Sequence, residues 1–175
     1  MEIYLIRHTS VDIPTGVCYG QTDVPLKESF EQEASVVAAQ LSELPFDEVF
    51  VSPLSRCVKL ASFCGWPDAC RDRRILEMNF GAWEMKKWGD IRDPHLQEWF
   101  DDYLNVQTTE GESFMQQYQR VSTFLDEIRK SSAQRIAVFT HGGVVICGQV
   151  YAGVKTAEEA FTSIPAYGSI TKLIL

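Results

Sequence analysis

The chain carries no excess of positive charge. Its 16 Lys and Arg residues are outnumbered by 24 Asp and Glu residues, giving a formal net charge of −8 over 175 residues. Non-specific binding to nucleic acid or to an acidic membrane surface requires a basic face, so the charge balance argues against both partners. It still allows a small anionic ligand that a few cationic side chains hold in a local pocket.

Cysteine pairs and long apolar runs are also missing. The five cysteines are odd in number and form no C-x-x-C pair, so neither a disulfide framework nor a zinc site is expected. No apolar run approaches the length of a membrane-spanning helix, and no secretion signal opens the chain. We therefore expect a cytoplasmic protein without a membrane partner. The sequence gives no indication of its oligomeric state.

Two common devices of phosphate chemistry are absent as well. There is no Gly-rich loop of the Walker type and no acidic cluster suited to a metal ion. This disfavours metal-dependent nucleotide chemistry, and we expect neither a metal nor a cofactor.

Short apolar runs alternate with amphipathic segments along the chain. Five runs are predicted to be strands: residues 2–7, 46–52, 71–80, 135–143 and 169–175. Four segments are predicted to be helices: residues 29–44, 52–65, 114–128 and 143–153. In the second of these helices, Ser52 is predicted to be the N-cap and Pro53 the first helical residue. The aromatic-rich stretch 80–103 is expected to hold further helical pieces.

This alternation predicts an α/β fold, a three-layer α/β/α sandwich with a mostly parallel central sheet. Hydrophobic residues make up 45% of the chain, enough for a packed core. The length suits a single domain over residues 1–175.

Three predicted strands end in residues suited to chemistry, in the segments "LIRH", "VFVSPLSR" and "VFTHGG". In open parallel sheets, ligands bind beyond the carboxyl ends of the strands, so these residues should meet at one edge. A single Arg or His at such a place is more often structural than functional. Their convergence, with two of only three histidines at strand ends, favours function.

Phosphoryl transfer is the chemistry that these groups suit. Arg7 and Arg56 offer forked donors for phosphate oxygens, and Gly142 and Gly143 begin a helix whose N–H groups could reach them. A neutral imidazole among such groups can attack phosphorus directly.

Four ordered motifs resemble the histidine phosphatase superfamily, whose fold is phosphoglycerate mutase-like. They are "LIRHTS", "SPLSRC", "RILEMNFGAWE" and "VFTHGG", and they span residue 3 to about residue 150. "CYGQTDVPL" and "EMNFGAWE" are most similar to its α-ribazole-5′-phosphate phosphatase branch, which acts in cobalamin nucleotide-loop assembly.

The resemblance implies a role for each matching residue. His8 would be the nucleophile that forms a phosphohistidine, while Arg7, Arg56 and His141 would clamp the transferring group. Glu77 would protonate the leaving alkoxide and then activate water. Glu84 is the alternative acid, and Glu77 could instead pair with Arg73 or Arg74.

The sequence departs from the family pattern at two places. Thr9 follows the Arg-His pair where most members have Gly. Pro14 and Thr15 stand where many members place a phosphate-contacting Asn, so Thr15 is a candidate substitute.

Three further residues are candidates for the pocket wall: Tyr19, Gln21 and Trp83. An indole could stack on the flat base of α-ribazole, although core packing explains the tryptophans Trp83, Trp88 and Trp99 equally well. His95 is expected to be a solvated helix residue.

The sequence therefore predicts a phosphomonoester hydrolase that acts through a phosphohistidine, with α-ribazole 5′-phosphate as the expected substrate. Two alternatives share the catalysis, a broad-specificity phosphatase and a phosphoglycerate mutase. A third alternative, of another class, is a non-catalytic phosphate-binding module on the same fold.

Overall fold

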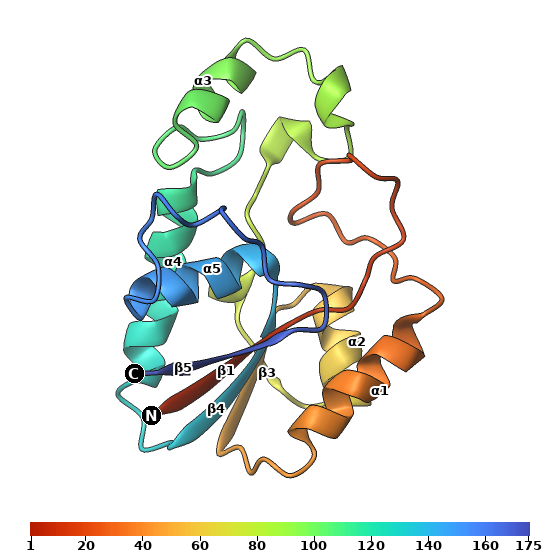
Figure 1. Ribbon diagram of the computed structural model, residues 1–175, viewed down its shortest axis with the longest axis vertical. Helices are drawn as coiled ribbons and strands as arrows, with labels where there is room; N and C mark the ends of the chain where they lie inside the picture. Colours follow the sequence, from red (N-terminus) through yellow and green to blue (C-terminus); the bar gives the residue numbers. More distant parts are fainter.

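Five strands form one sheet in the order β3-β2-β4-β1-β5, in a computed structural model that describes residues 1–175 (Figure 1). The four strands β1 to β4 run parallel to their neighbours, and β5 pairs antiparallel to β1 at the edge. The strands are β1 (Glu2–Arg7), β2 (Glu48–Val51), β3 (Cys70–Arg71), β4 (Arg135–Thr140) and β5 (Ile170–Ile174).

Helices cover both faces of the sheet. The pair α1 and α2 lies on one face and the pair α4 and α5 on the other, while α3 stands apart near the top of the view (Figure 1). The helices are α1 (Phe30–Leu41), α2 (Ser55–Phe63), α3 (His95–Asp101), α4 (Phe114–Ile128) and α5 (Gly142–Tyr151). The predicted three-layer sandwich with a mostly parallel sheet is thus confirmed.

Alternation along the central strands divides the core in two. Ile3 and Leu5 of β1 belong to the cluster under α4 and α5, whereas Tyr4 and Ile6 belong to the cluster under α1 and α2. Successive strand residues point to opposite faces, so a strand covered on both sides is apolar throughout. Each fully buried aliphatic side chain of this kind contributes about 1.5–3 kcal/mol.

Two elements differ most from the prediction, and the other predicted bounds are within three residues of the observed ones. The strand predicted over 71–80 is reduced to the two residues of β3, because Asp72 caps a 3-10 turn over Arg73–Ile75 and the chain leaves the sheet. Helix α2 begins at Ser55 with Leu54 at its N-cap, so the predicted cap at Ser52 is wrong. The hydroxyl of Ser52 is hydrogen-bonded to His141 instead.

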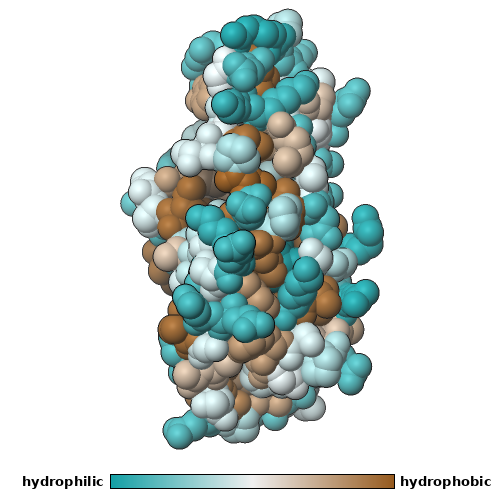
Figure 2. Space-filling view, turned by 90° about the vertical axis from the view of Figure 1, so that its right-hand side faces the viewer, coloured by the Kyte–Doolittle hydropathy of each residue, from teal (hydrophilic) through white to brown (hydrophobic).

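The surface is mixed in character. Figure 2 views the molecule from the side of α1 and α2, where apolar residues lie scattered among polar ones rather than in one continuous face. None of the helices combines the length and the apolar character needed to cross a bilayer.

Candidate active site

The two strand-end histidines lie side by side. His8 directly follows β1 and His141 directly follows β4, and Arg7 is in register with Thr140 in this parallel pair. The centroids of the two imidazole rings are 5.3 Å apart, and both side chains are buried. The ends of two adjacent central strands thus form the floor of a polar site.

His8 is held with one ring nitrogen free. Its Nδ1 lies 2.8 Å from the carbonyl oxygen of Thr9, and a carbonyl can only accept, so Nδ1 must carry the proton. Burial, and then the positive charges of Arg56 and Arg7, lower the pKa of His8 to about 3. At neutral pH the ring is therefore uncharged, with the lone pair of Nε2 available.

Arg7 presents its guanidinium beside this imidazole. The group stacks on the ring of Tyr167 at 4.0 Å from the centroid and donates from Nη1 to the carbonyl of Pro165. Its buried Nε has no acceptor.

Arg56, in the first turn of α2, is completely buried. Its Nη1 and Nη2 donate to the carbonyls of Thr22 and Gly20, at 3.0 and 2.6 Å, and its Nε also has no acceptor. A buried cation with unmet donors is costly unless an anion compensates it. The two arginines thus give an acidic protein a local anion site.

Ser52 orients the second histidine. Its hydroxyl lies 2.7 Å from Nε2 of His141, and the thiol of Cys57 lies 3.5 Å from the same atom. Burial lowers the pKa of His141 well below its usual range, and Arg56 adds to this effect. His141 is therefore also neutral at physiological pH.

Glu77 holds its carboxylate among three N–H donors. The Oε1 atom accepts from the Met78 amide at 2.9 Å and from Gln117 Nε2 at 3.1 Å, while Oε2 accepts from the Gly143 amide at 3.2 Å. The Gly143 amide, one of two considered for phosphate, is thus bonded to Glu77. The alternative partner Arg74 pairs instead with Asp72 and Glu127.

Glu84, the alternative acid, binds backbone amides of the loop that contains Gln21 and Thr22. Its carboxylate accepts from the amides of Gln21 and Thr22, at 2.8 and 2.6 Å, and from the Phe80 amide. Gln21 itself donates from Nε2 to the carbonyl of Glu77 at 3.0 Å, so it supports the Glu77 peptide.

A cavity of about 220 Å³ opens above these groups. Of the predicted site residues it is lined by Arg7, Glu77, Gly142 and Tyr19, and the hydroxyls of Tyr19 and Tyr167 meet at 2.7 Å across it. His8 does not line the cavity, but the centroid of its ring lies 5.5 Å from that of Tyr167, which does. The remaining walls are mostly apolar: Met78, Phe80, Ile146, Phe161 and Ile164.

The pocket-wall candidate Gln21 does not line the cavity, and Thr15 and Trp83 do not line it either. Thr15 is exposed in a turn. Trp83 is buried, donates from Nε1 to Asp93 at 2.7 Å, and packs edge-on against Trp88 and Trp99. It belongs to a small aromatic core, which is the packing alternative considered from the sequence. His95 is exposed at the start of α3, as expected.

Comparison with known proteins identifies the family of the chain. Residues 3–174 match the family model of the histidine phosphatase superfamily (branch 1). The chain belongs to this superfamily.

Relatives of the superfamily differ in the activity that their names state. Phosphoserine phosphatase 1 of Hydrogenobacter thermophilus is 27% identical over 149 residues, covering 81% of this chain and 71% of the relative. The adenosylcobalamin/alpha-ribazole phosphatase of Salmonella typhimurium is 28% identical over 153 residues, covering 83% and 76%. A solved structure from Escherichia coli, described as an alpha-ribazole-5′-P phosphatase, superposes with a TM-score of 0.90 at 25% identity, covering 98% of this chain and 89% of the other.

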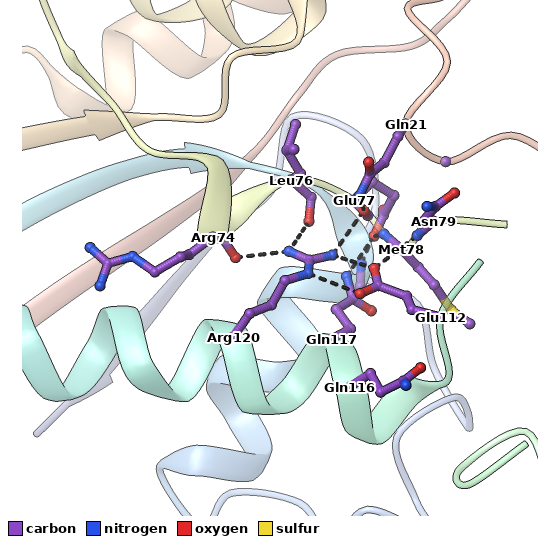
Figure 3. Close-up of polar contacts among 12 residues, drawn as sticks. Gln21, Arg74, Leu76, Glu77, Met78, Asn79, Glu112, Gln116, Gln117 and Arg120 are labelled. Atoms are coloured by element: carbon purple, nitrogen blue, oxygen red, sulfur yellow. Dashed lines mark hydrogen bonds and ion pairs between the residues drawn. The ribbon is translucent and has the colours of Figure 1, made fainter. Parts of the chain in front are cut away.

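Two residues of α4 that build this candidate site, Arg120 and Gln117, were not predicted from the sequence. Arg120 on α4 donates to the carbonyls of Arg74, Leu76 and Glu77, at 2.7–2.9 Å, and pairs with Glu112 (Figure 3). Gln117, one turn earlier, is fully buried. Its position on the apolar stripe of a helix was the available signal, because a polar residue there needs a partner.

Proposed function

We propose that residues 1–175 form one histidine phosphatase domain that hydrolyses a small phosphomonoester in the cytoplasm through a phosphohistidine on His8. The observation that carries this proposal is the state of His8. A neutral imidazole with its Nδ1–H tied to Thr9 leaves Nε2 as a nucleophile beside two guanidinium groups with unused donors.

In the first step, Nε2 of His8 attacks phosphorus and the ester P–O bond breaks. Glu77, protonated at this stage, gives its proton to the leaving alkoxide oxygen. Arg7, Arg56 and His141 stabilise the negative charge that spreads over the phosphoryl oxygens. Removing one such donor costs about 3–4 kcal/mol of transition-state stabilisation, by analogy with other preorganised sites.

In the second step, the Glu77 carboxylate takes a proton from water. The water oxygen attacks phosphorus, the Nε2–P bond breaks, and phosphate leaves with His8 neutral again. Glu77 ends protonated, ready for the next cycle, so no outside proton donor or oxidant is needed.

The cavity wall favours a substrate with a flat, uncharged leaving group. Arg7 is the only cation among the lining residues and is committed to the phosphoryl group. Phosphoserine and phosphoglycerate each carry a carboxylate that would need a second cation, whereas Phe80, Phe161 and Ile164 suit an aromatic base. We therefore propose α-ribazole 5′-phosphate as the substrate, in cobalamin assembly.

A substrate panel tests this function. The kcat/KM should be at least about tenfold higher for α-ribazole 5′-phosphate than for phosphoserine or 3-phosphoglycerate, since an unpaired buried charge costs more than 1.4 kcal/mol. Similar values for all three would indicate a broad-specificity phosphatase. Phosphate binding without turnover of any substrate, p-nitrophenyl phosphate included, would indicate a non-catalytic module.

A further inference from the structure

The side-chain amide of Gln117 is buried, and only its NH2 group has a hydrogen-bond partner. Its side chain is completely buried on α4, and Nε2 donates to Glu77 Oε1 at 3.1 Å. Its carbonyl Oε1 is also buried and has no donor anywhere in the chain. An unmet buried acceptor costs about 1–3 kcal/mol, so its presence beside the Glu77 carboxyl group needs a reason.

The space around this pair is closely fitted. A Cβ atom at Gly143 would lie 2.3 Å from Glu77 Oε1 and 2.8 Å from Gln117 Nε2. Position 143, in the first turn of α5, therefore has to be glycine if the Glu77 carboxylate and the Gln117 amide are to stay where they are. The carboxylate is thus fixed between α4 and the start of α5.

The other partners of Glu77 are donors only. The Met78 and Gly143 amides can donate to a carboxyl oxygen in either protonation state, but an N–H group cannot accept a hydrogen bond from a carboxyl O–H. The proposed function requires Glu77 to be a protonated acid in the first step and a carboxylate in the second. A carboxyl O–H needs an acceptor, and the unused Oε1 of Gln117 is the acceptor next to it.

We propose that Gln117 is a positioning residue that holds Glu77 in both protonation states by rotating its amide. The N–H donates to the carboxylate, and after a half-turn the C=O accepts the O–H of the carboxyl until the leaving oxygen of a bound substrate takes over as acceptor. This inference rests on the proposed function, because it matters only if Glu77 alternates between acid and base.

The test compares two leaving groups. Gln117→Met keeps the volume and removes both hydrogen-bonding halves; Gln119→Met makes the same change at an exposed position of the same helix. Rapid-quench measurement of His8 phosphorylation uses p-nitrophenyl phosphate, whose leaving group needs no acid, and ribose 5-phosphate, whose alkoxide does. In Gln117→Met, phosphorylation by ribose 5-phosphate should fall about 10- to 100-fold, a fraction of the full effect of general acid catalysis. Phosphorylation by p-nitrophenyl phosphate should change less than about threefold on the same basis, and Gln119→Met should match the wild type.

A second variant separates this role from a structural one. Gln117→Glu supplies an acceptor but no permanent donor, so the paired carboxyls should share a proton and favour the acid form. Phosphorylation by ribose 5-phosphate should persist, while hydrolysis of the phosphohistidine slows and the labelled intermediate accumulates.

The outcomes are distinct. Equal losses with both phosphate esters, or no loss with either, would overturn the inference, and so would a Gln117→Glu variant in which both steps slow alike. If Gln117→Met fails to fold, Gln117→Glu alone decides. Failure of the wild-type chain to phosphorylate His8 from either ester would count against the proposed function instead, and is measured first.

Discussion

The guanidinium of Arg120 meets the carboxylate of Glu112 at 2.6 Å, directly behind the peptide that carries Glu77. The same guanidinium donates to three backbone carbonyls in the segment from Arg74 to Glu77 (Figure 3). This segment lies outside regular structure after its short 3-10 turn, so its carbonyls depend on a side-chain donor. Arg120 of α4 thus fixes the backbone segment that carries Glu77, the proposed acid.

Replacing Arg120 should therefore affect both stability and activity. Arg120→Met leaves the carbonyls of Arg74 and Leu76 without the donor they have now and Glu112 without its cationic partner, whereas the Glu77 carbonyl keeps Gln21. The partial exposure of the ion pair reduces the cost to about 1–3 kcal/mol. Urea unfolding measures this loss, and kcat on an alkyl phosphate should fall with it. Arg129→Met, at the exposed C-cap of the same helix, should cost less than about 1 kcal/mol. Equal effects of the two changes would contradict the assigned role of Arg120.

The buried histidines predict how stability depends on pH. The pKa of His8 is about 3 in the folded chain and near 6.5 when unfolded, so below pH 6.5 the unfolded chain binds the extra proton. Stability should fall as pH drops from 6.5 toward 3, by up to about 1.4 kcal/mol per pH unit for each such histidine. His141 acts in the same direction.

Urea unfolding at pH 7.5 and pH 4.5 checks this prediction in the wild type and in His8→Gln. The variant cannot bind the proton, so its drop in unfolding free energy between the two pH values should be smaller. The carboxylates contribute equally to the pH dependence of the wild type and of the variant, so their contribution cancels when the two drops are compared. An equal drop in both would mean that His8 is not held neutral by the fold.

The proposed preference for an uncharged leaving group can be changed by a single cation. Ile164 lines the cavity and is 60% exposed, so Ile164→Arg should fold and place a positive charge where a substrate carboxylate would lie. The kcat/KM for phosphoserine should rise about fivefold relative to α-ribazole 5′-phosphate, as a partly exposed ion pair contributes up to about 1 kcal/mol. Val154→Arg, at an exposed position outside the cavity, is the control. The same change in selectivity in both variants would show that net charge, not the cavity wall, sets the preference.

The sequence was informative where local pattern and final environment agree. The strands at 2–7 and 135–140 are apolar on both faces because helices cover both, and their ends bring Arg7, His8 and His141 together. By contrast, β3 has only two exposed residues, so no apolar pattern predicts where it ends.

Most of the features that the sequence did not predict depend on contacts between residues far apart in the chain. Ser52 has the local setting of a helix cap, yet its hydroxyl is bound by His141, 89 residues later. Tyr167 covers Arg7 because the segment before β5 folds back over the sheet edge, which no local spacing reveals. The roles assigned to His8, Glu77 and Thr15 stay predictions that experiments must test.

The most direct test of the account is to find the phosphorylated residue. The wild-type chain, quenched within milliseconds of mixing with ³²P-labelled substrate, should carry an acid-labile, base-stable phosphoryl group on Nε2 of His8. His8→Ala should fold, carry no label and lose hydrolysis by at least about a thousandfold, since the nucleophile itself is gone. Retained turnover in His8→Ala, or label on another residue, would contradict the central claim.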